Sequence, residues 1–366
     1  GLLMVEQNVI IRLATAKDKK TLSKIKNNAF PFLMRFFFSS SKDTLVAEKN
    51  GEVVGGAVLK IFNLKNKKCG HVLELFVSKK EQNNGLGKKL VQASLAHMKT
   101  IGCEEVFACV EGNNTGSSNI FSKNGFAVLS LYDQIKNYGF SYFKLLYNTF
   151  HIFDIGHFLW KFPANQKHFD SSAVQFLMSI LLNIIVFLIA CLRINNSIWT
   201  APGELLYVSA AFSILFIVRF IFMITASKVQ RIPVRFRLWE SGITLNILIA
   251  GIFGGFFPVP GSIYPKQTEW RYPDLKKKLG IVGLSGIIST ALVLSIFTLI
   301  QKFGNTDHPL NTFVAYNILI GKNLLFFNVL IPIFPLGCYD SRRVFDNSKL
   351  LWAVLALICA FLIFLI

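Results

Sequence analysis

The spacing of apolar residues changes along the chain. Up to about residue 150, short apolar runs such as 72–77 alternate with polar stretches such as 78–85, a pattern typical of a soluble domain. From residue 172 onward, the apolar runs approach the roughly 20 residues that a helix needs to cross a bilayer. The pattern predicts a soluble half followed by a membrane half.

The soluble half is expected to be an α+β domain, a mixed sheet with flanking helices. An Asn50-Gly51 turn predicts a hairpin. Apolar residues at helical spacing predict a helix over 86–100. The expected strands are 9–14, 44–48, 53–61, 70–77, 105–110, 126–132 and 141–146, the last two as an antiparallel pair, and further helices are expected within 18–28 and 113–123.

The stretch 82–88, Gln-Asn-Asn-Gly-Leu-Gly-Lys, lies between a predicted strand and a predicted helix. The first amides of a helix lack internal partners, and its dipole favours an anion there. Gly85 and Gly87 would let the backbone approach a phosphate closely. The three glycines of a dinucleotide fingerprint are absent. The stretch therefore predicts a pyrophosphate site, and the alternative is an ordinary strand-to-helix turn.

Residues 8–148 resemble the GNAT N-acetyltransferase family in the order of their elements and in several motifs. These motifs are Q-x-x-G-x-G at 82–87, the strand 72–77, Asn113-Asn114, and F-x-x-x-G-F at 121–126. The resemblance implies an acetyl-CoA or other acyl-CoA cofactor, with its pyrophosphate on the glycine loop and its pantetheine arm along the strand. The binding residues implied are Phe76, Val77, Gln82, Asn83, Asn84, Gly85, Leu86, Gly87, Lys88, Asn113 and Phe121.

Catalysis would require a base for the acceptor amine and a proton for the leaving thiolate. Glu74, on the strand beside the implied thioester, is the candidate base, and the alternative is an outward-facing carboxylate on the flank of a strand. Many members of the family carry a tyrosine where this chain has Phe121, which has no proton to give. A water molecule could take its place.

The membrane half is expected to be an all-α polytopic domain over 172–366, with about five spanning helices and one re-entrant segment. The spanning candidates are 172–192, 204–225, 279–300, 312–334 and 349–366, and the run 241–259 would dip in and return. The aromatic stretch 149–171 is expected to be a linker at the lipid interface between this domain and the soluble domain, 1–148.

The net charge of +19 raises nucleic acid as a partner, but the basic residues favour anionic lipid instead. They concentrate on the soluble domain and in short loops between the membrane segments. The loops 226–239 and 260–278 are both strongly basic, so both should be cytoplasmic. Both loops can share a side only if 241–259 is re-entrant. This arrangement predicts an integral membrane protein whose N-terminal domain lies in the cytosol.

A second resemblance, over about 205–350, is to the site-2 intramembrane metalloproteases. It is carried by residues 328–336 with 340–342, by 236–239 and by 260–264. Zinc chemistry in that family needs two histidines one helical turn apart, a glutamate and a later aspartate. Residues 172–300 contain no histidine, and Asp340 is displaced from the expected position. We therefore expect a degenerate domain without zinc ligands. In it we expect Arg219 to extend its charge to the cytoplasmic surface, and the alternative is a functional charge within an apolar span.

The combined prediction is a membrane-bound N-acyltransferase that uses acetyl-CoA on an amine acceptor near the membrane. The alternative is a non-catalytic membrane subunit or adaptor, in which the first domain binds acyl-CoA or is purely structural. That alternative would bring other membrane protein subunits as partners.

Overall fold

The computed structural model describes residues 2–6, 9–30, 41–164, 171–194, 202–267, 269–304, 307, 309–333 and 336–364. The chain divides into two compact units. The first contains residues 1–151 and 157–169, and the second contains 152–156 and 170–366. Each unit is described by itself below.

The first unit is built on an eight-stranded sheet in the order β1-β2-β3-β4-β5-β6-β8-β7. Only β5 and β6 run parallel, and the other neighbours are antiparallel. The sheet is therefore mixed, as expected. The strands are β1 (Leu2–Glu6), β2 (Val9–Leu13), β3 (Thr44–Lys49), β4 (Glu52–Leu64), β5 (Lys67–Val77), β6 (Glu105–Glu111), β7 (Ala127–Val128) and β8 (His157–Phe162).

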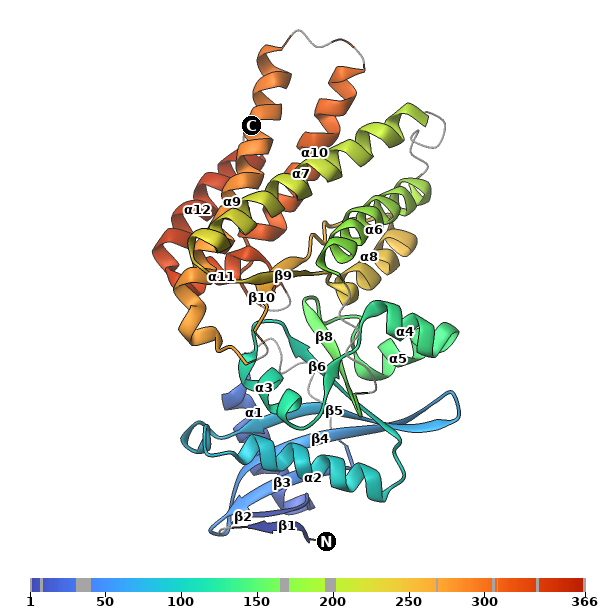
Figure 1. Ribbon diagram of the computed structural model, residues 1–366, viewed down its shortest axis with the longest axis vertical. Coiled ribbons are helices and arrows are strands. Elements are labelled where there is room, and N and C mark those ends of the chain that lie inside the picture. The colour runs from blue at the N-terminus through green and yellow to red at the C-terminus, as the bar shows by residue number, and fades with distance from the viewer. Residues whose placement is uncertain are drawn as a thin grey trace. The chain divides into compact units, whose positions relative to one another are not determined.

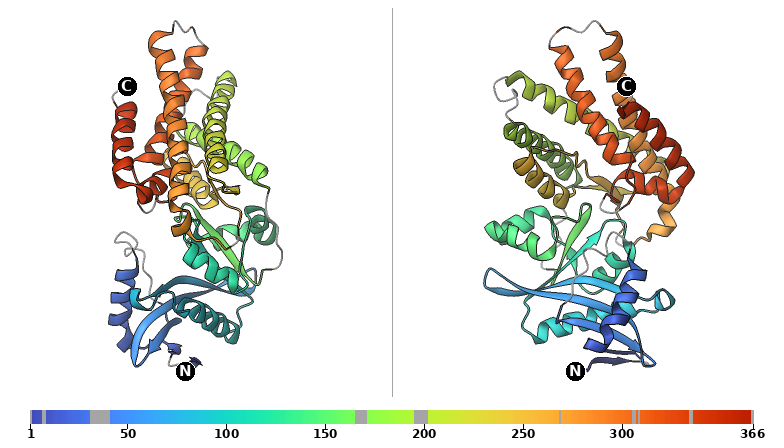
Figure 2. Two further views of the ribbon diagram at one scale, coloured as in Figure 1. Left: turned by 60° about the vertical axis from the view of Figure 1, so that its left-hand side comes forward. Right: turned by 180° about the vertical axis from the view of Figure 1, so that it is seen from behind.

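Helices cover both faces of this sheet (Figure 1). On one face, α2 (Leu86–Thr100) and α3 (Thr115–Lys123) enclose the main apolar core, in which Leu90 and Val91 are fully buried. On the other face, α1 (Lys19–Ala29) buries Leu22 against Val58 and Phe76. The right-hand view of Figure 2 shows α1 in front of the sheet. The remaining helices, α4 (Leu131–Tyr138) and α5 (Tyr142–Thr149), pack on a third cluster around Phe107 and Leu159.

The end of this unit differs from the sequence prediction. The strand expected at 141–146 is wrong, because these residues begin helix α5. The strand that pairs with β6 is β8, within the stretch 149–171 that we expected to lie at the lipid interface. Its aromatic residues follow the alternation of a strand, so that Phe158 is buried in the core. Residues 165–170 of that stretch lie outside the described residues.

The second unit is mainly helical, and its long helices are apolar. Four of them are long and apolar enough to cross a membrane: α6 (Ser172–Arg193), α7 from Gly203 to Val229, α9 (Tyr272–Phe303) and α10 (Leu310–Val329). The shorter elements are α8 (Glu240–Phe253), α11 (Asp340–Asn347), α12 (Lys349–Phe364), and a two-stranded ribbon of β9 (Val234–Arg237) and β10 (Ser262–Pro265). The predicted fifth span corresponds to α12, which is shorter, so five crossings remain a prediction.

A non-helical segment, 254–261, follows α8 and is deeply buried from residue 257 onward. Its backbone groups bond to side chains of the surrounding elements. Asn246 bonds both backbone groups of Phe257, at 2.5 and 3.2 Å, and Asn183 bonds both of Val259, at 2.8 and 2.9 Å. The hydroxyl of Tyr339 donates to the carbonyl of Pro258. Irregular backbone at membrane depth is tolerated where protein satisfies it in this way.

Arg219 does not extend to the surface, and that expectation is wrong. Its side chain is 3% exposed and donates two hydrogen bonds to one carboxylate oxygen of Asp340, at 2.8 and 3.0 Å. Asn328 also donates to that oxygen, and Arg219 donates to the carbonyl of Gly261. Asp340 lies 121 residues further along the chain, at the start of α11. The buried cation is therefore paired across the unit.

Removing one partner of a buried ion pair leaves the other charge uncompensated. We expect Arg219→Met to lower the free energy of unfolding by about 3–5 kcal/mol, and Arg219→Met with Asp340→Asn to lower it less. Denaturant titration of the purified protein in detergent measures both changes. Arg271→Met is the matched control, because its contact with Asp274 is exposed and about 0–1 kcal/mol is expected there. Equal stability of Arg219→Met and the wild type would contradict this account.

Candidate active site

The pairing of β5 with β6 ends part of the way along both strands. The last paired residues are Val72 on β5 and Ala108 on β6. Beyond them β5 continues to Val77, still paired with β4, and β6 continues to Glu111, still paired with β8. We call the facing edges, residues 73–77 and 109–111, the β5–β6 parting. Backbone groups on these edges lack a ladder partner among the described strands and can bind an extended ligand.

A β-bulge determines which side chains of β5 face which helix. The register of β4 and β5 shifts between Val58 and Leu59, so that Leu73 is an extra residue. After the bulge, Phe76 packs against α1, whereas Leu75 and Val77 pack in the core beneath α2. Glu74 shares the α1 side with Phe76 because side chains of a strand alternate.

Glu74, the candidate base, is held in an ion pair. Its carboxylate lies 2.5 Å from the ammonium nitrogen of Lys26 on α1, and its side chain is 9% exposed. The same ammonium lies 5.8 Å from the ring centre of Phe76. The alternative of an outward-facing carboxylate therefore does not describe Glu74. The structure places it at the β5–β6 parting, and its role as a base remains a prediction.

The glycine loop follows β5 after one turn of 3-10 helix, Lys79–Glu81. Gly85 is the N-cap residue of α2 and has a φ of 77°, a conformation that favours glycine. As it has no side chain, it cannot cap the first amides of the helix, those of Leu86, Gly87 and Lys88. The backbone at Asn83 is also left-handed, with a φ of 67°. The predicted glycine turn before the helix is thus confirmed, and its binding of an anion stays a prediction.

Side chains tie this loop to the sheet. Gln82 donates to the carbonyl of Val77 at 3.2 Å, and Asn84 donates to the carboxylate of Glu81 at 3.2 Å. Lys49 of β3 also contacts Glu81, at 2.8 Å, and this bond lowers the pKa of the Glu81 carboxyl below its usual value. Because Lys49 balances the charge of Glu81, the carboxylate opposes an incoming phosphate less than an isolated one would.

A pocket of about 380 Å³ lies between the end of β5 and the last turns of α1. Its lining includes Ile25, Asn28, Val77 and Lys79. Its lining residues come from the helix that carries Lys26 and from the end of the strand that carries Glu74.

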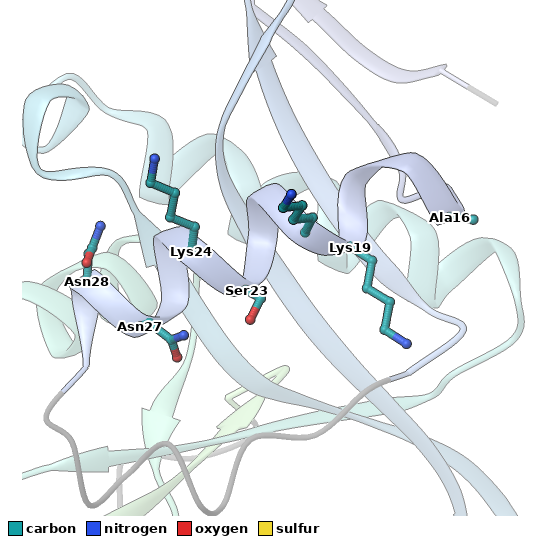
Figure 3. A pocket seen from close by; sticks show the side chains of 7 residues that line it. Ala16, Lys19, Ser23, Lys24, Asn27 and Asn28 are labelled. Atoms are coloured by element: carbon teal, nitrogen blue, oxygen red, sulfur yellow. The ribbon is translucent and has the colours of Figure 1, made fainter.

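The outward side of α1 forms a separate, shallow pocket lined by polar and basic side chains. Lys19, Lys24, Ser23 and Asn27 project from successive turns of this helix (Figure 3). Lys24 is exposed, whereas Lys26 is buried, because the two side chains leave opposite sides of the helix. Only the inward side reaches Glu74.

The other two predicted binding residues lie on or before α3. Asn113 is buried, and its backbone amide donates to Glu111 at 3.2 Å. Phe121 is 3% exposed, with its ring centre 5.0 Å from that of Phe126. Phe121 is therefore a core residue, and contact with a cofactor stays a prediction.

Lys26 was not identified from the sequence. Its signal was the helical spacing of Leu22, Ile25, Lys26 and Ala29, which puts one lysine on an otherwise apolar face. A second missed contact joins Cys109 of β6 to His151, with 3.7 Å between the thiol sulfur and Nδ1. No spacing along the sequence connects these two residues. Within the described ranges, no group of three or more metal-ligating side chains gathers.

Comparison with known families matches residues 16–126 to the acetyltransferase (GNAT) family. An N-alpha-acetyltransferase of Sulfurisphaera tokodaii is 34% identical over 131 residues, which cover 32% of this chain and 78% of that protein. A chain in the crystal structure of the NatC complex bound to Gag peptide and CoA is 17% identical and has a TM-score of 0.33. That match covers 43% of this chain and 100% of that one.

A further similarity is to a protein of Methanocaldococcus jannaschii that is named as a zinc metalloprotease. The two are 27% identical over 122 residues, 33% of this chain. The matched region spans 60% of the length of that relative.

Proposed function

The chain belongs to the acetyltransferase (GNAT) family, and from this premise we propose that it transfers an acetyl group from acetyl-CoA to an amine at or near a membrane. The observation that carries the proposal is the β5–β6 parting, which leads directly to the uncapped start of α2. The extended arm of acetyl-CoA needs a backbone edge such as the parting, and its charged pyrophosphate needs an anion site such as the start of α2.

Each part of the cofactor has a physical counterpart in the first unit. The amides of Leu86, Gly87 and Lys88 would hold the pyrophosphate, with the helix dipole adding favourable charge. The arm would pair with the edge of β5 at residues 73–77, as an added strand does. The acetyl group would then lie near Glu74, where β5 and β6 separate.

The acceptor is an amine, and we propose the α-amino group of a polypeptide. The relatives from Sulfurisphaera tokodaii and Sulfolobus acidocaldarius, both named N-alpha-acetyltransferase, favour this class. Glu74 would accept the proton of the acceptor ammonium, for which Lys26 must first release the carboxylate. Transfer in this unit would then act on chains presented at the membrane.

The second unit is proposed to be a membrane domain of the site-2 protease type that has lost its zinc chemistry. Four long apolar helices support membrane insertion, and the first unit would lie in the cytosol. The buried 254–261 segment supports a re-entrant element. Asp340, the aspartate nearest to the family's metal position, is engaged by Arg219. A cation of the protein itself already balances that carboxylate.

A non-catalytic role as a membrane subunit is the second candidate, and one observation favours it. Phe121 is buried in the core and offers no proton to a leaving thiolate. In that case the first unit would bind acyl-CoA without turnover.

The glycine loop can be tested with two matched substitutions. Gly85→Val should weaken acetyl-CoA binding at least tenfold, because a branched side chain would occupy the phosphate position and strain a φ of 77°. Gly51→Val imposes the same strain in the β3–β4 turn, with equally open surroundings, and should bind acetyl-CoA normally. Isothermal calorimetry compares the two variants. Equal binding by both, or none by the folded wild type, would overturn the cofactor site.

The role of Glu74 can be tested by removing its charge and keeping its shape. Glu74→Gln should bind acetyl-CoA but lose about 100- to 10,000-fold in turnover, which is the usual contribution of a general base. Thiol release over a panel of peptide N-termini measures turnover. Glu48→Gln, which breaks the ion pair with Arg12, is the control for loss of a sheet carboxylate. A panel that stays silent with the wild type, with binding intact, favours the subunit role.

Zinc content tests the proposal for the second unit. Elemental analysis of the purified protein should find less than stoichiometric zinc, because Arg219 occupies the carboxylate of Asp340. Asp340→Asn serves as the comparison and should leave the zinc content unchanged. Stoichiometric zinc that survives mild chelation, and that falls in Asp340→Asn, would show that Asp340 is a metal ligand.

A further inference from the structure

Lys26 is an amine that the fold itself places beside the proposed base. Its side chain is 10% exposed, and its nitrogen lies 2.5 Å from the carboxylate of Glu74. It also lies over Phe76, two residues further along β5. Lysine rarely becomes buried without a partner, and here the partner is the group proposed to deprotonate acceptors.

The neighbouring lysines of α1 provide a contrast. Lys19, Lys20 and Lys24 line its outward side and are exposed. Lys26 belongs to the same helix but faces the strand along which we propose that the acetyl-CoA arm lies. Lys26 differs from these three lysines in its position on the helix and not in its residue type.

We propose that Lys26 is an acetyl acceptor within the same molecule, so that the protein acetylates its own α1. This inference rests on the proposed function and adds an internal substrate to it. It assigns to Lys26 the position that the amine of an external acceptor would take at Glu74. The Lys26–Glu74 ion pair then represents the acceptor site filled by the protein's own amine.

The atoms and charges of the proposed reaction balance as in an ordinary acyl transfer. Glu74 takes one proton from the Lys26 ammonium, and the neutral nitrogen attacks the thioester carbonyl of acetyl-CoA. The C–N bond forms and the C–S bond breaks. The departing thiolate takes the second proton from nitrogen, and Glu74 passes its proton to water. The products are N-acetyl-lysine, free CoA and one proton.

Acetylation would change the site permanently. An amide carries no charge, so Lys26 would lose its ion pair with Glu74. The carboxylate would then be free of its internal cation, although the longer acetylated side chain must find room beside Phe76. The modification therefore alters access for external amines.

The test is peptide mapping by mass spectrometry after the purified chain is incubated with acetyl-CoA. Lys26 should gain one acetyl group faster than Lys24, at a first-order rate that does not change with protein concentration. Spontaneous acetylation follows exposure and would modify Lys24 first, which would overturn the inference. A rate that rises with protein concentration would also overturn it, because it indicates transfer between molecules.

Two variants complete the experiment. Glu74→Gln should slow modification of Lys26 at least tenfold and leave Lys24 unaffected, whereas Lys26→Arg should remain unmodified at that position while acetyl-CoA still binds. Acetylation of external peptides without modification of Lys26 would overturn only this inference. Failure of the wild type to bind acetyl-CoA would overturn the proposed function as well.

Discussion

The separation of β5 from β6 is the constraint on which the chemistry proposed for the first unit depends. A sheet normally satisfies the backbone of each inner strand on both edges. Here β5 is paired on both sides only as far as Val72, and beyond that only with β4. The bulge at Leu73 occurs at the same place and turns Glu74 and Phe76 toward α1. The separation thus leaves a backbone edge of β5 without a ladder partner, and the bulge positions a carboxylate beside that edge.

In the second unit, by contrast, side chains bond the backbone groups of the irregular segment. Asn183 and Asn246 each bond both backbone groups of one residue in the 254–261 segment. The backbone amide of Phe236 in β9 donates to Ser172, and that of Leu238, the residue after β9, donates to Gln175. Arg343 donates to the carbonyl of Ile263 in β10. Side chains therefore occupy positions at which an added peptide strand would otherwise pair.

Local signals explain which parts of the structure the sequence could predict. The glycine turn at 82–88, the Asn50-Gly51 hairpin and the long apolar helices depend on residues close together in the chain, and they were predicted. The closing strand was not, because its aromatic residues suit either a lipid interface or a sheet core, and only the pairing with β6 decides between them.

Ion pairs between residues far apart in the chain could not be predicted from the sequence, for a different reason. Nothing in the run around Arg219 shows that a carboxylate 121 residues away will neutralise it, so the general rule for charges near helix ends gave the wrong result. Glu74 was identified as a candidate from its strand, yet its partner comes from α1, which the sequence places only as a helix. Predicting this contact requires knowing which helix covers which face of the sheet.

The ion pairs of Arg219 with Asp340 and of Lys26 with Glu74 also differ in the cation that each uses. Arginine stays charged at any working pH and donates in a fixed fork, which suits Arg219 at the enclosed centre of the second unit. Lysine can lose its proton and then act as a nucleophile, and Lys26 contacts Glu74 at the β5–β6 parting, along which we propose that the acetyl-CoA arm lies. An arginine there would stabilise Glu74 equally well but could never become an acyl acceptor. The choice of lysine at the β5–β6 parting is therefore consistent with chemistry at that position, and the choice of arginine at Asp340 with permanent charge neutralisation.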